Sequence, residues 1–181
     1  MIGETINAPY AEKFTVSNVF SSDMVVQRGE HIRVWGFADA SENGHKVSGE
    51  FMGMFAEALI ENGAWTLTFG ARLNACAEQG NSMRIYTDRT AFVFENVLVG
   101  DVFMVIGQSN VAYSMAAHRA AVPEAERGGV GYDVPSTPIR LHYNSLTQET
   151  GVTRGTEEVC AELRNRETWK RADAAAVQDV S

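Results

Sequence analysis

The tetrapeptide Gly107-Gln108-Ser109-Asn110 closes an apolar run, DVFMVIG, with residues that suit chemistry better than packing. A serine between a strand and a helix faces the free N–H groups and the positive dipole end at the start of that helix. Those groups can stabilise the oxyanion that forms when a serine hydroxyl attacks an ester carbonyl. Gly107 permits a tight turn, and Asn110 can hydrogen-bond to the loop or to a substrate. The pattern predicts a nucleophile turn with Ser109 as the attacking group.

A structural interpretation of the same residues stays open at this point. Serine and asparagine are preferred helix N-caps, so Ser109 or Asn110 could simply cap the helix that follows. The pattern differs from the GxSxG elbow of α/β-hydrolases, because Val111 stands where the second glycine would be. From the residues alone, the tetrapeptide is either a catalytic turn or an ordinary strand-to-helix turn.

The neighbouring segments predict a strand, a helix and a second strand. The run DVFMVIG is almost continuously apolar, which is typical of a central strand covered on both faces. Residues 110–121 are good helix formers, and Pro123 sets the latest end of that helix. A loop is predicted over 125–138, followed by a short strand in IRLHYN. Residues 101–144 are therefore expected to form one βαβ unit of a parallel sheet.

A lone βαβ unit cannot bury its own apolar strand, because a central strand needs neighbours on both edges and cover on both faces. Residues 145–166 predict no further element, and the final ADAAAVQDVS (172–181) resembles the opening of a helix with Asp173 as candidate N-cap. We expect a longer polypeptide or a second chain to complete the sheet.

Residues 14–100 show a different sequence pattern, in which short β runs alternate with turn residues. The runs are FTVSNVF, MVVQ, HIRVWGFA, KVSGEFM, MFAEALIE, AWTLTF, SMRIYT and AFVFENVLV. Turn pairs separate them, including Gly80-Asn81 and Asn62-Gly63, the latter being the best hairpin signal in the chain. This spacing without helices predicts an antiparallel, jelly-roll-like sandwich.

Composition limits the partners. The chain has 181 residues, 45% of them hydrophobic, and a formal net charge of −8 without a cluster of Lys and Arg. Nucleic acids and anionic membrane surfaces are therefore poor partners, whereas a neutral sugar or ester is compatible. No apolar stretch has the length of a membrane span, and no signal peptide is visible, which leaves the compartment open.

The positions of the tryptophans and cysteines indicate which of them could belong to a functional site. Trp35 and Trp65 lie in alternating runs, which predicts core positions for both, whereas Trp169 lies in an irregular segment and could line a substrate cleft. Cys76 and Cys160 belong to no CxxC pattern, so neither a zinc site nor a disulfide framework is indicated.

Three separated strings, FSSDMVVQRG, IRVWGFA and ENVLVGDVFMVIGQSN, resemble the sialate O-acetylesterase family, carbohydrate esterases of the SGNH (GDSL-like) group. The resemblance runs from about Phe14 to Ser181 and later includes TPIRLHYN and TWKRADAAAVQDVS. It implies an N-terminal extension (1–13), a β-sandwich domain (14–99) and the first part of a three-layer α/β SGNH catalytic domain (100–181).

The resemblance also implies roles for the tetrapeptide. Ser109 matches the family's nucleophile, whose backbone N–H contributes to the oxyanion hole. Gly107, Gln108 and Asn110 match the motif and are assigned to positioning of the oxyanion or substrate. Val111 stands where the family commonly has Met, an apolar exchange that keeps the packing.

The family's remaining motifs, a glycine and an asparagine of the oxyanion hole and a DxxH segment that supplies the base, are absent from the sequence. None of the four histidines, His31, His45, His118 and His142, stands in a DxxH pattern, and a structural or solvent role is predicted for His118 and His142. A serine is a poor nucleophile without a neighbouring base, so the rest of the active site is expected outside this chain.

The implied reaction is removal of O-acetyl groups from sialic acid or another acylated carbohydrate through an acyl-serine intermediate. No metal or organic cofactor is suggested. Two alternatives stay open: a non-catalytic carbohydrate-binding or interaction module, and an inactive fragment of a longer esterase.

Overall fold

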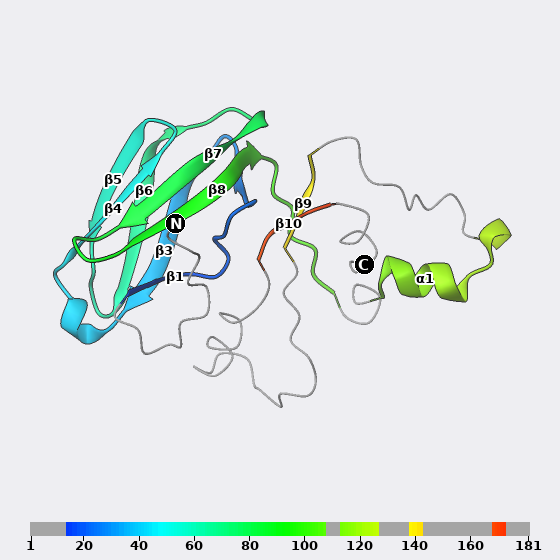
Figure 1. Ribbon diagram of the computed structural model, residues 1–181, viewed down its shortest axis with the longest axis horizontal. Coiled ribbons are helices and arrows are strands. Elements are labelled where there is room, and N and C mark those ends of the chain that lie inside the picture. The colour runs from blue at the N-terminus through cyan, green and yellow to red at the C-terminus, as the bar shows by residue number, and fades with distance from the viewer. Residues whose placement is uncertain (1–13, 108–112, 127–137, 143–167, 173–181) are drawn as a thin grey trace.

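The computed structural model describes residues 14–107, 113–126, 138–142 and 168–172. The predicted N-terminal extension, the helix expected after residue 172 and Cys160 lie outside them. Figure 1 shows the strands of residues 14–100 at one end of the molecule and the helix α1 (Met115–Ala121) at the other. Within these four ranges, no helix is long and apolar enough to cross a membrane.

Eight strands occupy residues 14–100, and the later described ranges contain two short ones. Each of the eight predicted β runs coincides with all or part of one strand, and β7 begins six residues before its predicted run. The strands are β1 (Phe14–Val16), β2 (Val25–Gln27), β3 (His31–Ala38), β4 (Lys46–Phe51), β5 (Met54–Leu59), β6 (Ala64–Arg72), β7 (Cys76–Tyr86), β8 (Ala91–Gly100), β9 (Arg140–Leu141) and β10 (Lys170–Arg171). The predicted β-rich character is confirmed.

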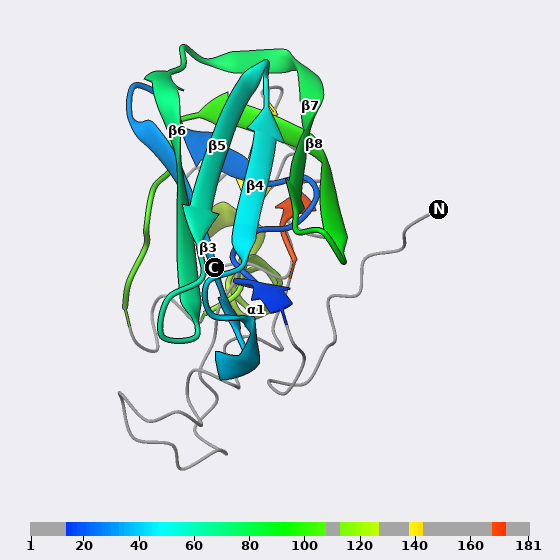
Figure 2. The same cartoon turned by 90° about the vertical axis from the view of Figure 1, so that its left-hand side faces the viewer.

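The first eight strands form two sheets, with the orders β1-β3-β6 and β2-β8-β7-β4-β5. Figure 2 shows β5 between β4 and β6, so the larger sheet curls toward the smaller one. The larger sheet is mixed, because β2 runs parallel to β8. The expectation of a purely antiparallel arrangement is wrong there, since β2 and β8 are far apart in the sequence and no hairpin sets their relative direction.

Two predicted turns have different outcomes. Both residues of Asn62-Gly63 have positive φ, and a bridge closes this turn, so it is confirmed. Gly80-Asn81 lies inside β7, where the pairing with β8 shifts register, so the expected turn is wrong. Because Gly80 has no side chain, the strand can pass against Asn96 at this irregularity.

Both sheets contribute to one apolar core. Its most deeply buried members include Val34 and Leu67 from the smaller sheet and Phe51, Met83 and Ile85 from the larger one. Full burial of a side chain of this size stabilises the folded state by about 1.5–3 kcal/mol relative to exposure. The shared core therefore holds the two sheets together.

The tryptophans of β3 and β6 differ in burial. Trp65 is buried and stacks on Phe14 with ring centroids 5.1 Å apart, as expected for a core residue. Trp35 is 41% exposed, so the core position expected for it is wrong. Alternation explains the difference: Trp35 shares its side of β3 with Arg33, whereas Trp65 shares its side of β6 with Leu67.

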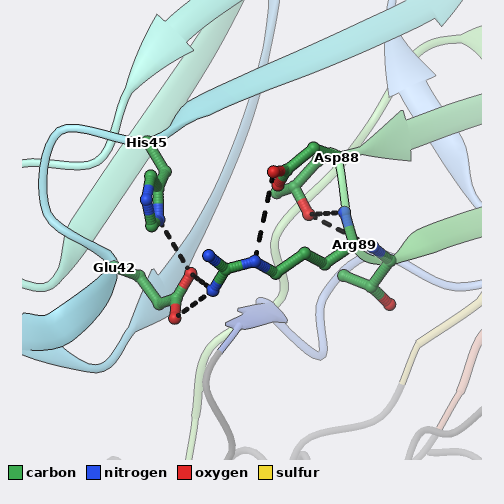
Figure 3. A network of polar contacts seen from close by, with 6 residues as sticks. Glu42, His45, Asp88 and Arg89 are labelled. Carbon is green, nitrogen blue, oxygen red and sulfur yellow. Dashed lines mark hydrogen bonds and ion pairs between the residues drawn. The ribbon is translucent and has the colours of Figure 1, made fainter.

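A buried carboxylate ties two turns together near the start of β8. Glu42, in the short helix η1 (Ala40–Glu42), accepts hydrogen bonds from His45 Nδ1 at 3.0 Å and from Arg89 Nη1 at 3.1 and 3.4 Å (Figure 3). β8 has ten residues and spans about 30 Å, so this cluster lies far from Gly100 at the other end of the strand. Its contacts stabilise the turns there.

Candidate active site

The structure describes one of the four predicted site residues. Gly107 ends the described segment 101–107, whereas Gln108, Ser109 and Asn110 lie outside the described residues. Their catalytic and positioning roles stay predictions. The structure does describe the chain immediately before these residues and the helix α1 after them.

The segment 101–107 has no regular secondary structure, so the strand predicted there is wrong. Its apolar side chains face solvent: Phe103 is 85% exposed and Ile106 is 78% exposed. A buried strand needs neighbours that pair its N–H and C=O groups and cover its faces, and no described strand pairs with this segment. The apolar composition indicates burial that the described residues do not supply.

The parallel βαβ unit predicted over 101–144 is not what the described residues form. β9 lies in the predicted second β run but pairs antiparallel with β10, with Arg140 opposite Arg171. A parallel unit requires its first strand, and the segment 101–107 does not form one.

The helix α1 confirms part of the predicted helix. It ends at Ala121, before Pro123, as expected. Its N-cap is Ser114, whose hydroxyl accepts a hydrogen bond from the Ala117 N–H at 3.1 Å. A short helix η2 (Glu124–Glu126) follows. Because Ser114 caps α1, the capping role considered for Ser109 or Asn110 does not apply to this helix.

The start of the segment 101–107 is fastened to β2 and the residue after it. Arg28 Nε donates a hydrogen bond to Asp101 Oδ1 at 2.8 Å, and Gln27 Oε1 accepts one from the Val102 N–H at 2.8 Å. The Arg28 N–H donates to the Gly100 carbonyl at 2.9 Å. These bonds fix the position of residues 100–102, where the chain leaves β8.

The ion pair between Arg28 and Asp101 makes this attachment pH-dependent. The hydrogen bond and charge of Arg28 lower the pKa of Asp101. A lowered pKa means stabilisation that is present at neutral pH and lost as the pH falls below about 3.9 and through the lowered value. We expect an NMR titration to show a higher Asp101 midpoint in an Arg28→Gln variant than in the wild type, and equal midpoints would contradict the ion pair.

Trp169 attaches the segment 168–172 to the turn before β2. Its backbone N–H donates to Ser21 Oγ at 3.0 Å, and its indole Nε1 donates to the Val19 carbonyl at 2.7 Å. The His142 ring lies beside it, with centroids 5.3 Å apart. The indole therefore packs against the β-rich part as an anchor, which differs from the substrate-cleft position considered for it.

Asp23 is the charged centre of the same junction. It accepts hydrogen bonds from the Asn96 amide and from Arg171 Nε, the latter at 3.0 Å, and Arg140 Nε lies 3.9 Å away. The Arg140 side chain is only 8% exposed. Burial lowers the pKa of Arg140, whereas the charge of Asp23 opposes this change. Asp23 thus compensates a buried cation of β9.

An Asp23→Ala variant is expected to release β9 and β10, because it leaves the buried Arg140 uncompensated and removes the acceptor of Arg171. Hydrogen exchange of the Ala172 amide, which donates to the Ile139 carbonyl, should accelerate about tenfold or more. Asp88→Ala, which removes an exposed aspartate from another turn, should leave that rate unchanged. Equal rates in wild type and Asp23→Ala would contradict the junction.

Sequence reasoning missed the residues that make these attachments. Asp23, Gln27 and Arg28 lie within the string FSSDMVVQRG, which carried the family resemblance, but their partners lie far along the chain. His31 and His118 sit in β3 and α1 respectively, on separate elements. Within the described ranges, no group of three or more His, Cys, Asp or Glu side chains could hold a metal ion.

The fold resembles that of part of a known protein, although its sequence matches no known family. No protein-family model and no curated protein sequence matches the chain. Among solved structures, it is similar to a carbohydrate acetylesterase from Xanthomonas citri, with a TM-score of 0.58, 19% sequence identity and coverage of 92% of this chain. The chain spans 34% of the length of that protein. The chain thus has a fold like that of part of a carbohydrate esterase.

Proposed function

We propose that this chain carries the nucleophile of a serine esterase that removes O-acetyl groups from sialic acid or another acylated carbohydrate. The supporting observation is the fold similarity to a carbohydrate acetylesterase, together with the Gly-Gln-Ser-Asn turn at residues 107–110. The neighbour's name gives the reaction class, and the residues of the turn give the chemistry.

In the proposed reaction, Ser109 Oγ attacks the ester carbonyl while a base outside this chain accepts its proton. The sugar oxygen leaves with a proton and an acetyl-serine remains, which water then hydrolyses to acetate and free serine. The Ser109 N–H contributes to the oxyanion hole, and Gly107, Gln108 and Asn110 position the loop or the substrate. The chemistry assigned to these residues needs no metal or organic cofactor.

The proposal assigns residues 14–99 to a jelly-roll-like sandwich domain and residues 100–181 to the first part of a three-layer α/β SGNH domain. Its support is the exposed apolar run from Val102 to Ile106, whose surface further polypeptide would cover. The chain spans only 34% of its structural neighbour, so polypeptide equivalent to the rest of that protein is the proposed source of this cover and of the base.

A second candidate function is a non-catalytic carbohydrate-binding module, and an inactive fragment of a longer esterase is the third. The exposed Trp35 on a sheet face favours the module, because its indole ring offers an apolar face on which a sugar ring can stack. A binding module explains residues 14–100 but does not explain the tetrapeptide at 107–110.

Hydrolysis of p-nitrophenyl acetate, measured alongside the intact mass of the particle in solution, tests the proposal. We expect hydrolysis above background in a preparation whose mass includes a partner chain or a longer polypeptide. Background rates in every preparation, including one with such a partner, would contradict the esterase. Background rates from a lone 19.8 kDa chain would show that this chain is not an enzyme by itself and would leave the binding module or the inactive fragment.

A further inference from the structure

The outer face of the sheet β1-β3-β6 combines an exposed tryptophan with cations. Burial alternates along β3 and β6, so one side of each strand packs into the core and the other faces solvent. We call the solvent side the β3 face. It comprises Thr15 of β1, His31, Arg33, Trp35 and Phe37 of β3, and Thr66, Thr68 and Arg72 of β6.

Trp35 lies at the centre of the β3 face, on the middle strand. The Phe20 ring contacts it edge to face, with centroids 4.6 Å apart and an interplanar angle of 81°, which holds the indole in place. Thr66 lies directly opposite Trp35 in the register, and Thr68 lies opposite Arg33. A held aromatic ring bordered by hydroxyl groups suits the apolar ring face and polar rim of a sugar.

The β3 face carries cationic side chains and no acidic one. The whole chain has 23 acidic residues and a net charge of −8, whereas β1, β3 and β6 contain no Asp or Glu. Arg33 and Arg72 form no ion pair with a described carboxylate, and His31 lies opposite Arg72. A ligand on this face meets exposed guanidinium groups whose charge is complementary to carboxylates.

We propose that the β3 face binds a carboxylate-bearing carbohydrate chain, at a site separate from Ser109. One sugar ring stacks on Trp35, and the carboxylate of a neighbouring sugar pairs with Arg33, whose side chain leaves the same strand about 7 Å away. Thr66 and Thr68 bond to hydroxyl groups. Two arginines are too few for a nucleic acid, which draws its affinity from many phosphate contacts.

Affinity electrophoresis in gels containing polygalacturonate tests the proposal, with its fully methyl-esterified form as the uncharged match. We expect polygalacturonate to retard the wild-type protein and the ester to bind at least tenfold more weakly. Trp35→Ala and Arg33→Gln should each weaken binding about tenfold or more. Phe55→Ala and Arg84→Gln remove an exposed aromatic ring and an exposed arginine from the other sheet and should leave binding unchanged.

Several outcomes would overturn the proposal. These are absence of retardation of the wild type, equal binding of the methyl ester, and equal losses in the variants of the two sheets. Equal binding of a single-stranded oligonucleotide would show a general polyanion surface instead. Circular dichroism of each variant separates loss of binding from loss of fold. The result is independent of Ser109, so it stands or fails apart from the esterase proposal.

Discussion

Replacing Ser109 by alanine is expected to lower the rate of acetyl-ester hydrolysis at least about a thousandfold, because the acyl-serine intermediate cannot form without its hydroxyl. The measurement is hydrolysis of p-nitrophenyl acetate and of an acetylated sugar by a preparation in which the wild type is active. Substrate binding should change little, since alanine removes only the attacking oxygen. The loss should therefore appear in kcat.

Ser114→Ala is the matched control for that variant. It removes a serine hydroxyl five residues further on, which caps α1, and should cost the helix about 1 kcal/mol without touching the reaction. We expect Ser114→Ala to keep most of the hydrolytic rate. A Ser109→Ala protein that keeps more than a tenth of the wild-type rate, or an equal loss in both variants, would show that Ser109 is not the nucleophile.

Phe69→Ala is expected to destabilise the fold by about 3–5 kcal/mol, the typical cost of emptying a buried phenylalanine site. Phe69 is fully buried in β6, and its ring meets that of Phe51 in β4 with centroids 6.4 Å apart, so the contact crosses from one sheet to the other. Urea unfolding followed by circular dichroism measures the change in free energy of unfolding.

Phe55→Ala provides the control, because Phe55 is 56% exposed on β5 and should contribute less than about 0.5 kcal/mol. A loss below about 1 kcal/mol for Phe69→Ala would contradict the shared core of the two sheets. A comparable loss for Phe55→Ala would indicate that the outer side of β5 is covered.

The strands of residues 14–100 could be predicted because their signals are local. Period-two alternation and turn residues lie within each run, and they located all eight strands. The same alternation could also have separated the tryptophans. Trp35 alternates in phase with the polar His31 and Arg33, whereas Trp65 alternates in phase with the apolar Leu67 and Phe69. The outward position of Trp35 could therefore be predicted from the sequence.

The segment 101–107 and the junction at Asp23 could not be predicted from local patterns. An apolar run becomes a strand only when neighbours pair with it, and the sequence of the run does not say whether they are present. The contacts of Asp23 with Arg140 and Arg171 join parts of the chain that are far apart in sequence. Such contacts follow from tertiary structure, where a single charged residue gives no signal of its partner.

The most direct measurement is covalent labelling with a fluorophosphonate, followed by peptide mapping, on a preparation that hydrolyses acetyl esters. Phosphonates react with serines that a neighbouring base has activated. The proposed mechanism predicts one label, on Ser109, and loss of both label and hydrolysis in Ser109→Ala. A label on another residue of the hydrolysing preparation, or hydrolysis that continues with Ser109 unlabelled, would contradict it.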